Sequence, residues 1–198
     1  MWAIVLAAGE SKRMGFPKML LDINGSSMLG TVINNIKGSD VDNVLVVLGA
    51  YNDILAPLVT NYFVNSCYNE NYKDGMLSSV KCGIRYLPHD IEAVLIFQCD
   101  QPFIRPDVIN KVIKSYRNSD KGIIIPVCNN KRGHPLLLDK QYTPEIEKLD
   151  ANGGLRSLAL LYSEDVLEIE TGDNGILMDF DTYEEYNSIK PNKNERDN

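Results

Sequence analysis

The segment after the first apolar run of the chain, residues 7–18, combines residue types that bind anions. It holds two glycines, a proline and three cations against one acid, in a chain whose formal net charge is -7. Gly9 permits close approach of backbone N–H groups to an anion. Arg13 can donate paired hydrogen bonds to phosphate oxygens, and Lys18 can serve as a point charge. These residues indicate a polyphosphate site, and a solvated loop with incidental charges is the competing interpretation.

The spacing of the glycines excludes two common phosphate loops. A Walker A loop needs GxxxxGK[ST], but Gly9 and Gly15 are separated by five residues and Phe16 stands where lysine is required. The dinucleotide fingerprint GxGxxG is absent from the sequence. Pro17 stiffens the backbone just before Lys18. If the loop binds phosphates, it does so with another arrangement.

The bulk composition is that of an ordinary globular chain. It has 198 residues, of which 44% are hydrophobic and 24% charged, which is enough to bury a sizeable core. We expect a single domain over residues 1–189 and a disordered polar tail over residues 190–198. The net charge of -7 argues against a nucleic-acid partner. No apolar run approaches the roughly 20 residues that cross a membrane.

The cysteine pattern matches no metal site. Cys67, Cys82, Cys99 and Cys128 form no CxxC pair and fit no zinc template. We expect buried, reduced thiols and a cytoplasmic location, because free cysteines are common in cores and survive in reducing compartments. The N-terminal segment is short and lacks the basic start of a signal peptide.

The elements that must position these residues follow a β-α-β-α rhythm. Short apolar runs predict buried strands, and longer amphipathic segments predict helices. This rhythm predicts an α/β fold: a three-layer α/β/α sandwich with a mostly parallel, Rossmann-like sheet. The expected strands are residues 3–6, 44–48, 63–65, 94–97, 122–127, 136–138 and 166–169. The expected helices are residues 28–36, 53–59, 78–87, 106–116, 143–149, 154–161 and a last one from about 182.

Ligands in open parallel sheets bind at the carboxyl ends of the strands. That rule selects residues 7–18, the stretch after Asn65, and the loops at residues 99–102 and 129–134. These segments are also the richest in glycine, proline and polar residues. We therefore expect them to meet in one crevice.

Five segments of the sequence together resemble a known family. LAAGESKRMGFPKMLL resembles the signature LAAGxSxRMGxPKxLL of nucleotidyltransferases with a glycosyltransferase-A-type fold. GMLSSVKCGI, FQCDQPFI, GHPLLL and DFDTYEEY follow in the order typical of the MocA-like molybdenum cofactor cytidylyltransferases, within the MobA-like NTP transferase superfamily. The resemblance covers residues 3–186 and implies the nucleotide-diphospho-sugar transferase fold.

The resemblance implies roles for individual residues. Arg13, Lys18 and Asp100 would be catalytic. Ala8 favours CTP, because relatives that use GTP usually read Leu-Ala-Gly-Gly at this turn. The implied nucleotide-binding residues are Leu6, Ala7, Ala8, Gly9, Ser11, Arg13, Lys18, Gly75, Met76, Ser78, Ser79 and Asp100. The implied acceptor-binding residues are Gln101, Pro102, Gly133, His134 and Pro135.

Two carboxylates are expected to hold Mg²⁺ with the nucleotide. Asp100 follows an expected strand, and Asp181 occupies the position of the second acidic ligand in the resembling families. Asp179 is the alternative, since it shares a face with Asp181 in an extended segment. The competing interpretation of Asp100 and Asp181 is that they cap a turn or a helix. Ser78 has a similar alternative role as the N-cap of a helix. The competing interpretation of His134 is a structural role as a hydrogen-bonding side chain.

The activity that the resemblance implies is transfer of CMP from CTP to the terminal phosphate of molybdopterin, with release of pyrophosphate. One alternative is a cytidylyltransferase for a sugar or polyol phosphate such as methylerythritol phosphate. Another is a non-catalytic molybdenum cofactor chaperone. A molybdenum hydroxylase is a possible client, and neither nucleic acid nor a membrane is an expected partner.

Overall fold

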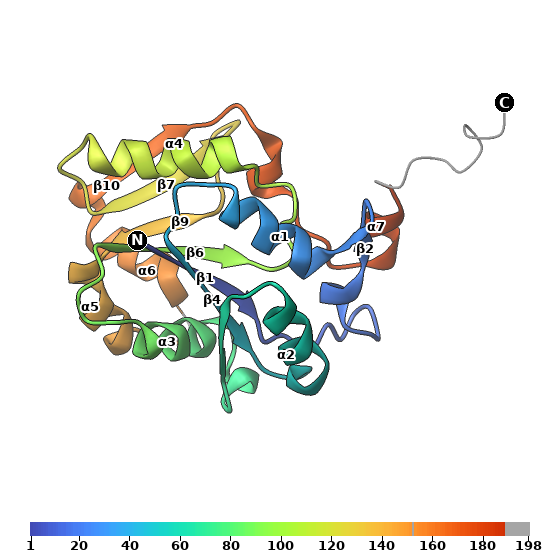
Figure 1. The fold of residues 1–198 in the computed structure, drawn as a ribbon. Helices are drawn as coiled ribbons and strands as arrows, with labels where there is room; N and C mark the ends of the chain where they lie inside the picture. Colours follow the sequence, from blue (N-terminus) through green and yellow to red (C-terminus); the bar gives the residue numbers. More distant parts are fainter. Residues whose placement is uncertain (152, 189–198) are drawn as a thin grey trace, which may run out of the picture.

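The protein is built around an eight-stranded sheet (Figure 1). The computed structural model describes residues 1–151 and 153–188. The strand order is β10-β7-β9-β6-β1-β4-β5, with the short β8 paired to β7. The strands are β1 (Trp2–Ala7), β4 (Asn43–Leu48), β5 (Asn65–Tyr68), β6 (Ala93–Gln98), β7 (Ile123–Cys128), β8 (Lys131–Arg132), β9 (Leu136–Asp139) and β10 (Val166–Glu170).

Most pairs in the sheet are parallel. β1 lies between β4 and β6 and runs parallel to both. β9 is inserted antiparallel between β6 and β7, while β10 runs parallel to β7. The parallel arrangement brings the carboxyl ends of β1, β4, β5 and β6 to one edge.

Helices cover both faces of the sheet, which confirms the expected three-layer α/β architecture. α1 (Met28–Lys37), α2 (Asn52–Asn61) and α4 (Pro106–Arg117) pack on one face. α3 (Met76–Tyr86), α5 (Thr143–Lys148) and α6 (Gly154–Leu161) pack on the other. The sheet is therefore the middle layer of a sandwich.

The side chains of β1 show why a continuous apolar run forms a central strand. Ala3 and Val5 belong to the core under α1, α2 and α4. Ile4 and Leu6 belong to the core under α3, α5 and α6. Alternate residues of a strand point to opposite faces, so a strand covered on both sides is apolar throughout.

A third, smaller core packs residues that follow β1 in the sequence against residues near the C-terminal end of the described chain. The hairpin of β2 (Asp22–Ile23) and β3 (Ser26–Ser27) lies beside α7 (Tyr183–Ser188) (Figure 1). Phe180 and Tyr186 are buried there against Leu21 and Ile23. The Tyr186 hydroxyl donates a hydrogen bond of 2.8 Å to the carbonyl of Asp22. This packing brings the segment with Asp181 to the loop that follows β1.

Several element boundaries differ from the sequence expectation by one to three residues, and two of these differences bear on the site. The strand expected at residues 63–65 begins at Asn65 instead, because Phe63 has a φ of 55° and is 92% exposed in the turn after α2. The helix expected from Ser78 begins two residues earlier, at Met76. Gly75 precedes it with a φ of 92°, a conformation that favours glycine, so the turn into the helix occurs before Ser78.

Three further expectations concern the chain as a whole. Within the described residues, no helix is long and apolar enough to span a bilayer. The expected tail at residues 190–198 lies outside the described residues. A single domain over residues 1–189 and a cytoplasmic location stay predictions.

Candidate active site

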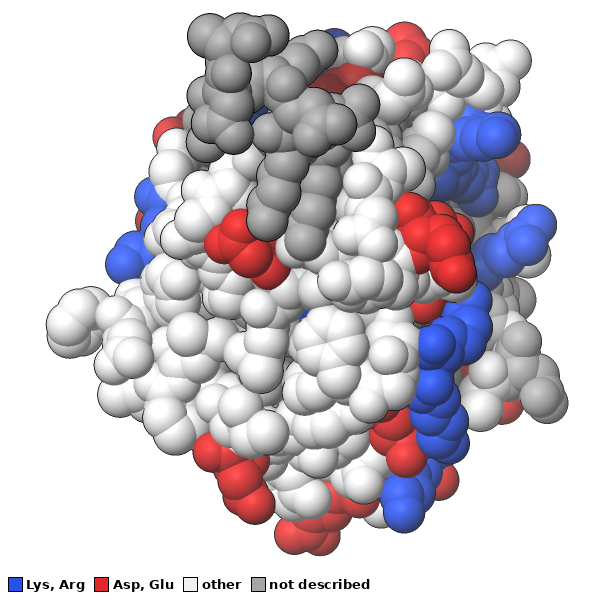
Figure 2. Space-filling view, turned by 90° about the vertical axis from the view of Figure 1, so that its right-hand side faces the viewer, with Lys and Arg blue, Asp and Glu red and all other residues white. Residues whose placement is uncertain are grey.

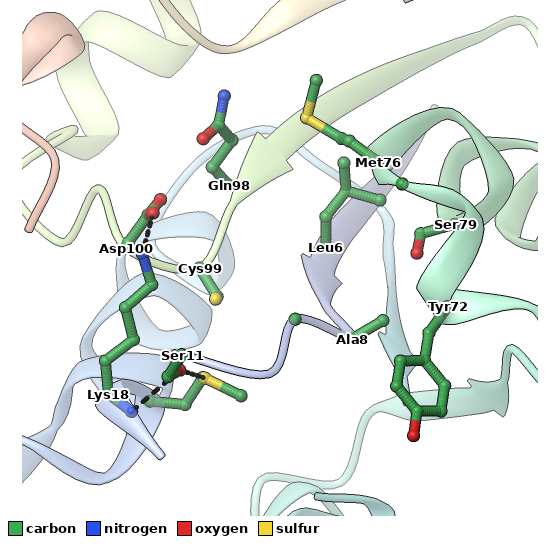
Figure 3. Close-up of a pocket in the computed structure, with 13 residues that line it drawn as sticks. Leu6, Ala8, Ser11, Lys18, Tyr72, Met76, Ser79, Gln98, Cys99 and Asp100 are labelled. Carbon is green, nitrogen blue, oxygen red and sulfur yellow. Dashed lines mark hydrogen bonds and ion pairs between the residues drawn. The ribbon is translucent and has the colours of Figure 1, made fainter. Parts of the chain in front are cut away.

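A pocket of about 240 Å³ opens where β1 and β6 end (Figure 3). Figure 2 looks onto this edge of the sheet, where the centre is mostly uncharged and Lys and Arg gather along one border. The pocket combines the loop after β1, the start of α3 and the end of β6. It is lined by Leu6, Ala8, Gly9, Ser11, Lys18, Met19, Tyr72, Gly75, Met76, Ser79, Gln98, Cys99 and Asp100.

A second hollow of about 310 Å³ shares Gly9, Ser11 and Lys18 with this pocket. It adds Arg13 and Asp181, together with Glu10 and Lys12. The two spaces are therefore adjacent, and we call them together the cleft. One part is largely apolar, and the other is lined by charged side chains.

Ser11 organises the loop between these spaces. Its φ is 48°, and its carbonyl accepts hydrogen bonds from the backbone N–H groups of Met14 and Gly15 at 3.0 and 3.2 Å. Its hydroxyl accepts one from the backbone N–H of Lys18 at 3.3 Å. Gly9 is exposed, and a Cβ built on it would meet no atom within 4 Å. The loop is thus held in one shape, and its backbone at Gly9 is open to a ligand.

Lys18 joins the two carboxylates that the sequence selected. Its Nζ lies 2.5 Å from Oδ2 of Asp100 and 3.0 Å from Oδ1 of Asp181. Arg13 Nη2 lies 2.9 Å from Oδ2 of the same Asp181. The side chains of Lys18 and Asp100 are 14% and 11% exposed, whereas that of Arg13 is 71% exposed. Asp179 is exposed and forms no ion pair with Lys18 or Arg13 among the described residues, but partial burial and then the charge of Asp100 raise its pKa, so it lies near the cluster.

The contacts in the cluster shift the pKa values of Lys18 and Asp181. Burial alone would lower the pKa of Lys18, but Asp100 and Asp181 outweigh that effect and raise it. The hydrogen bond from Lys18 lowers the pKa of Asp181, although partial burial opposes the shift, and the charge of Arg13 adds to it. Both shifts favour the charged forms of Lys18 and Asp181.

The carboxylates fit a divalent cation. Oδ1 of Asp100 is buried and has no hydrogen-bond partner among the described residues. Mg²⁺ is commonly bound by one or two carboxylates together with phosphate oxygens and water. No group of three or more His, Cys, Asp or Glu able to hold a metal occurs within residues 1–151 and 153–188. Asp100 and Asp181 therefore suit a cation that takes its other ligands from a substrate and water.

The far wall of the pocket is built on a buried asparagine that sequence reasoning missed. Asn69, at the end of β5, is 4% exposed. Its Nδ2 donates to the hydroxyls of Ser78 and Ser79 at 2.9 and 3.0 Å. Its Oδ1 accepts the backbone N–H of Asn71 at 3.0 Å. A single Asn after a short strand does not by itself indicate a functional role, and only its place at the ligand-binding edge of the sheet could have drawn attention to it.

The structure separates the two serines of the GMLSS segment. Ser79 is buried and lines the pocket, opposite Lys18 in Figure 3. Ser78 lies in a different surface hollow, and its hydroxyl is 2.8 Å from the carbonyls of Asn71 and Gly75. Ser78 is inside the first helical turn, so it is not the N-cap of α3.

Most of the expected nucleotide-binding residues come together, with three exceptions. Leu6, Ala8, Gly9, Ser11, Lys18, Gly75, Met76, Ser79 and Asp100 line the pocket. Arg13 lines the second hollow, and Ser78 is outside both. Ala7 is buried in the core on the opposite face of the sheet from Leu6.

The expected acceptor residues gather around the 3₁₀ turn η5 (Asn174–Leu177). The backbone N–H of His134 donates to the carbonyl of Ile176 at 3.2 Å. The Nε2 of Gln101 donates to the same carbonyl at 3.4 Å. A Cβ on Gly133 would meet this oxygen at 2.4 Å, so only glycine fits there. Pro135, joined to His134 by a cis peptide bond, is buried.

These acceptor residues adjoin the pocket but do not line it. Gln98, another residue that the sequence analysis missed, connects the two regions. It lines the pocket, and its Nε2 lies 3.2 Å from Nε2 of His134. Burial lowers the pKa of His134, and the charge of Asp100 only partly opposes this. Pro102 is buried, and its carbonyl accepts a hydrogen bond of 2.9 Å from Nδ2 of Asn35.

Comparison with known proteins finds a matching family model and related chains. The model of the MobA-like NTP transferase domain matches residues 3–166. A molybdenum cofactor cytidylyltransferase of Escherichia coli (strain K12) is 28% identical over 187 residues, covering 94% of each chain. A probable molybdenum cofactor guanylyltransferase of Natranaerobius thermophilus is 32% identical over 127 residues, covering 64% of this chain and 60% of the relative.

Solved structures share the fold. Rv0371c from Mycobacterium tuberculosis H37Rv has a TM-score of 0.82 at 20% identity, covering 95% of this chain and 96% of that one. A manganese complex of the same protein has a TM-score of 0.76 and covers 94% and 96%. The family match spans most of the sheet and the loop with Lys18. The chain therefore belongs to the MobA-like NTP transferase family.

Proposed function

We propose that the protein transfers CMP from CTP to the terminal phosphate of molybdopterin and releases pyrophosphate. The observation that carries this proposal is the contact of Lys18 with both Asp100 and Asp181 beside the open backbone of Gly9. It gathers cations for phosphates and carboxylates for a metal ion in one cleft. The Escherichia coli relative named as a cytidylyltransferase supports the choice of reaction.

The apolar part of the cleft suits the nucleoside, and the charged part suits the phosphates. Leu6, Ala8 and Met76 offer apolar surface to a base, and Ser79 offers a hydroxyl. Arg13, whose exposed side chain pairs with Asp181, binds the β- and γ-phosphates that leave. Lys18 stabilises the charge that grows on the α-phosphate.

Little acid–base chemistry is needed for this transfer. The attacking phosphate of the acceptor is already anionic, so positioning and charge stabilisation dominate the rate. Asp100 and Asp181 would hold Mg²⁺, which neutralises phosphate charge when bound. Gln101 and His134 lie beside the pocket, and in this proposal the acceptor binds on their side. His134 contacts the acceptor in this proposal and removes no proton from it.

The choice of CTP over GTP rests on Ala8. It is 4% exposed, and it lines the pocket at the turn where the resembling GTP-dependent enzymes have glycine. The relative named as a probable guanylyltransferase makes GTP the main competitor. Delivery of the product to a molybdenum hydroxylase in the cytoplasm completes the proposal.

One assay separates the candidate reactions. The protein is mixed with Mg²⁺, with CTP, GTP or ATP, and with molybdopterin carrying molybdenum or methylerythritol phosphate, and pyrophosphate release is measured. Release only with CTP and the pterin supports the proposal. Release with methylerythritol phosphate assigns the sugar-phosphate reaction instead. Tight pterin binding without pyrophosphate release from any nucleotide assigns the chaperone role.

A further inference from the structure

Two cysteines from different elements are in contact behind the pocket. Sγ of Cys67, on β5, lies 3.9 Å from Sγ of Cys82, on α3. Cys67 is buried, whereas Cys82 is partly exposed and lines a surface hollow of about 420 Å³. Cys99 and Cys128 are buried elsewhere in the core, and Cys128 Sγ lies 3.2 Å from Oδ1 of Asn174. Cys67 and Cys82 therefore differ from the other two thiols, because each has a second thiol beside it and Cys82 reaches solvent.

We propose that Cys67 and Cys82 form an oxidisable dithiol, which low-molecular-weight disulfides convert into a disulfide between β5 and α3. A disulfide bond is about 2.05 Å long, so the two sulfurs must approach by roughly 2 Å. β5 can make part of this movement because it is the last strand of the sheet and pairs with β4 on one side. The side chains already meet across the β5–α3 interface.

The reaction proceeds by two exchanges. The Cys82 thiolate attacks a sulfur of the small disulfide, forms a mixed disulfide and expels one small thiol. The Cys67 sulfur, after losing its proton to solvent, attacks the Cys82 sulfur and expels the second small thiol. Two protein thiols are oxidised, and one small disulfide is reduced to two thiols. Burial, and then the neighbouring Cys82, raise the pKa of Cys67, so the second exchange is the slower one.

The pair lies next to the contacts that shape the pocket wall. Cys67 precedes Asn69 by two residues, and Asn69 holds the hydroxyls of Ser78 and Ser79. Cys82 follows Ser79 by three residues on the same helix, so the two are neighbours along one helical face. Drawing Cys82 toward β5 displaces the start of α3 relative to the pocket. Oxidation therefore alters nucleotide binding, a consequence that rests on the proposed function.

The disulfide is tested on the full chain with oxidised glutathione as the probe. After incubation, free thiols are blocked, and intact mass and disulfide-linked peptides are measured. The wild type and the matched control Cys128→Ser should each lose two hydrogens, with Cys67 linked to Cys82. Cys67→Ser should stop at one glutathione on Cys82, and Cys82→Ser should stay reduced. Four free thiols in the wild type, or a glutathione that remains on Cys82, would overturn the proposal.

The consequence for the pocket is tested separately. Amide hydrogen exchange over residues 69–79 should differ between reduced and oxidised protein, and unchanged exchange would contradict the coupling. CTP should bind the oxidised form roughly 10-fold more weakly, with recovery after reduction, because a displacement of about 1 Å is costly at such sites. If the disulfide forms and exchange changes but neither form binds CTP, the proposed function fails and the dithiol stands.

Discussion

Nζ of Lys18 lies 2.5 Å from Oδ2 of Asp100, although 82 residues separate the two in the sequence. Lys18 comes from the loop after β1, and Asp100 follows β6, so the parallel pairing of these central strands creates the contact. The same ammonium reaches Asp181 from the C-terminal part of the chain. One lysine thus connects the phosphate loop to both candidate metal ligands.

Removing either partner should stop turnover while leaving the fold intact. Lys18→Ala and Asp100→Ala are each expected to lower the rate of pyrophosphate release 10²- to 10³-fold, or about 2.7–4 kcal/mol, as loss of transition-state charge stabilisation typically does. Circular dichroism checks that each variant is folded. Lys148→Ala is the matched control, because Lys148 is 69% exposed and pairs with Glu145. Near-wild-type rates in either site variant would show that its assigned role is wrong.

Lys18 should also compete with a metal ion for the carboxylates. In protein without nucleotide, its ammonium neutralises Asp100 and Asp181, and a divalent cation must displace it. Lys18→Ala should therefore bind Mn²⁺ more tightly, by about 10-fold or ~1.4 kcal/mol. Electron paramagnetic resonance of free Mn²⁺ measures this directly, again with Lys148→Ala as control. Unchanged or weaker binding would mean that the cation uses other ligands.

His134 predicts a specific pH dependence of stability. Its pKa in the folded protein is below the ordinary value of 6.5, so at lower pH the unfolded chain binds a proton that the folded chain excludes. The free energy of unfolding should fall as pH drops from about 6.5 through the pKa of the folded state. His134→Gln should remove this component in urea titrations, and His89→Gln, at an exposed position, should not. Equal slopes in His134→Gln and wild type would contradict the burial effect.

Ala8 should influence the choice of nucleotide. Its side chain lines the pocket, so Ala8→Gly enlarges the space for the base by one methyl group. We expect the ratio of kcat/KM for GTP to that for CTP to rise about 10-fold, the lower end of what one methylene contributes to discrimination. Ala7→Gly is the matched control, because Ala7 packs on the other face of the sheet. An unchanged ratio in Ala8→Gly would assign base recognition to other residues.

The central part of the site could be predicted from the sequence, because its position depends on local patterns. Apolar runs gave β1 and β6, and the rule that ligands bind at strand ends brought the Lys18 loop and Asp100 together. The expected role of Asp181 came from the family resemblance. Its actual approach to Lys18 depends on the packing of Phe180 and on the bond from Tyr186 to Asp22, contacts that no local pattern reveals.

The second wall was harder to predict. Phe63 and Val64 are of types that favour strands. However, Phe63 has a positive φ and belongs to the turn after α2, so β5 begins only at Asn65. Because the expected strand ends at residue 65, the rule for strand ends does not select Asn69, which directly follows β5 and donates hydrogen bonds to Ser78 and Ser79. Ser78 suits an N-cap by type, yet Gly75 makes the turn earlier. Gln98 is polar at the end of an apolar strand, and only its tertiary contact with His134 shows its position between two regions.

The most direct test of the proposed reaction follows the α-phosphate itself. The protein is incubated with Mg²⁺, molybdopterin carrying molybdenum, and CTP labelled at the α-phosphate. Label should move into the pterin dinucleotide with one pyrophosphate released per label transferred, and Asp100→Ala should transfer almost none. Label that remains in CTP under these conditions, or that moves equally well with the Asp100→Ala variant, would contradict transfer of CMP at this site.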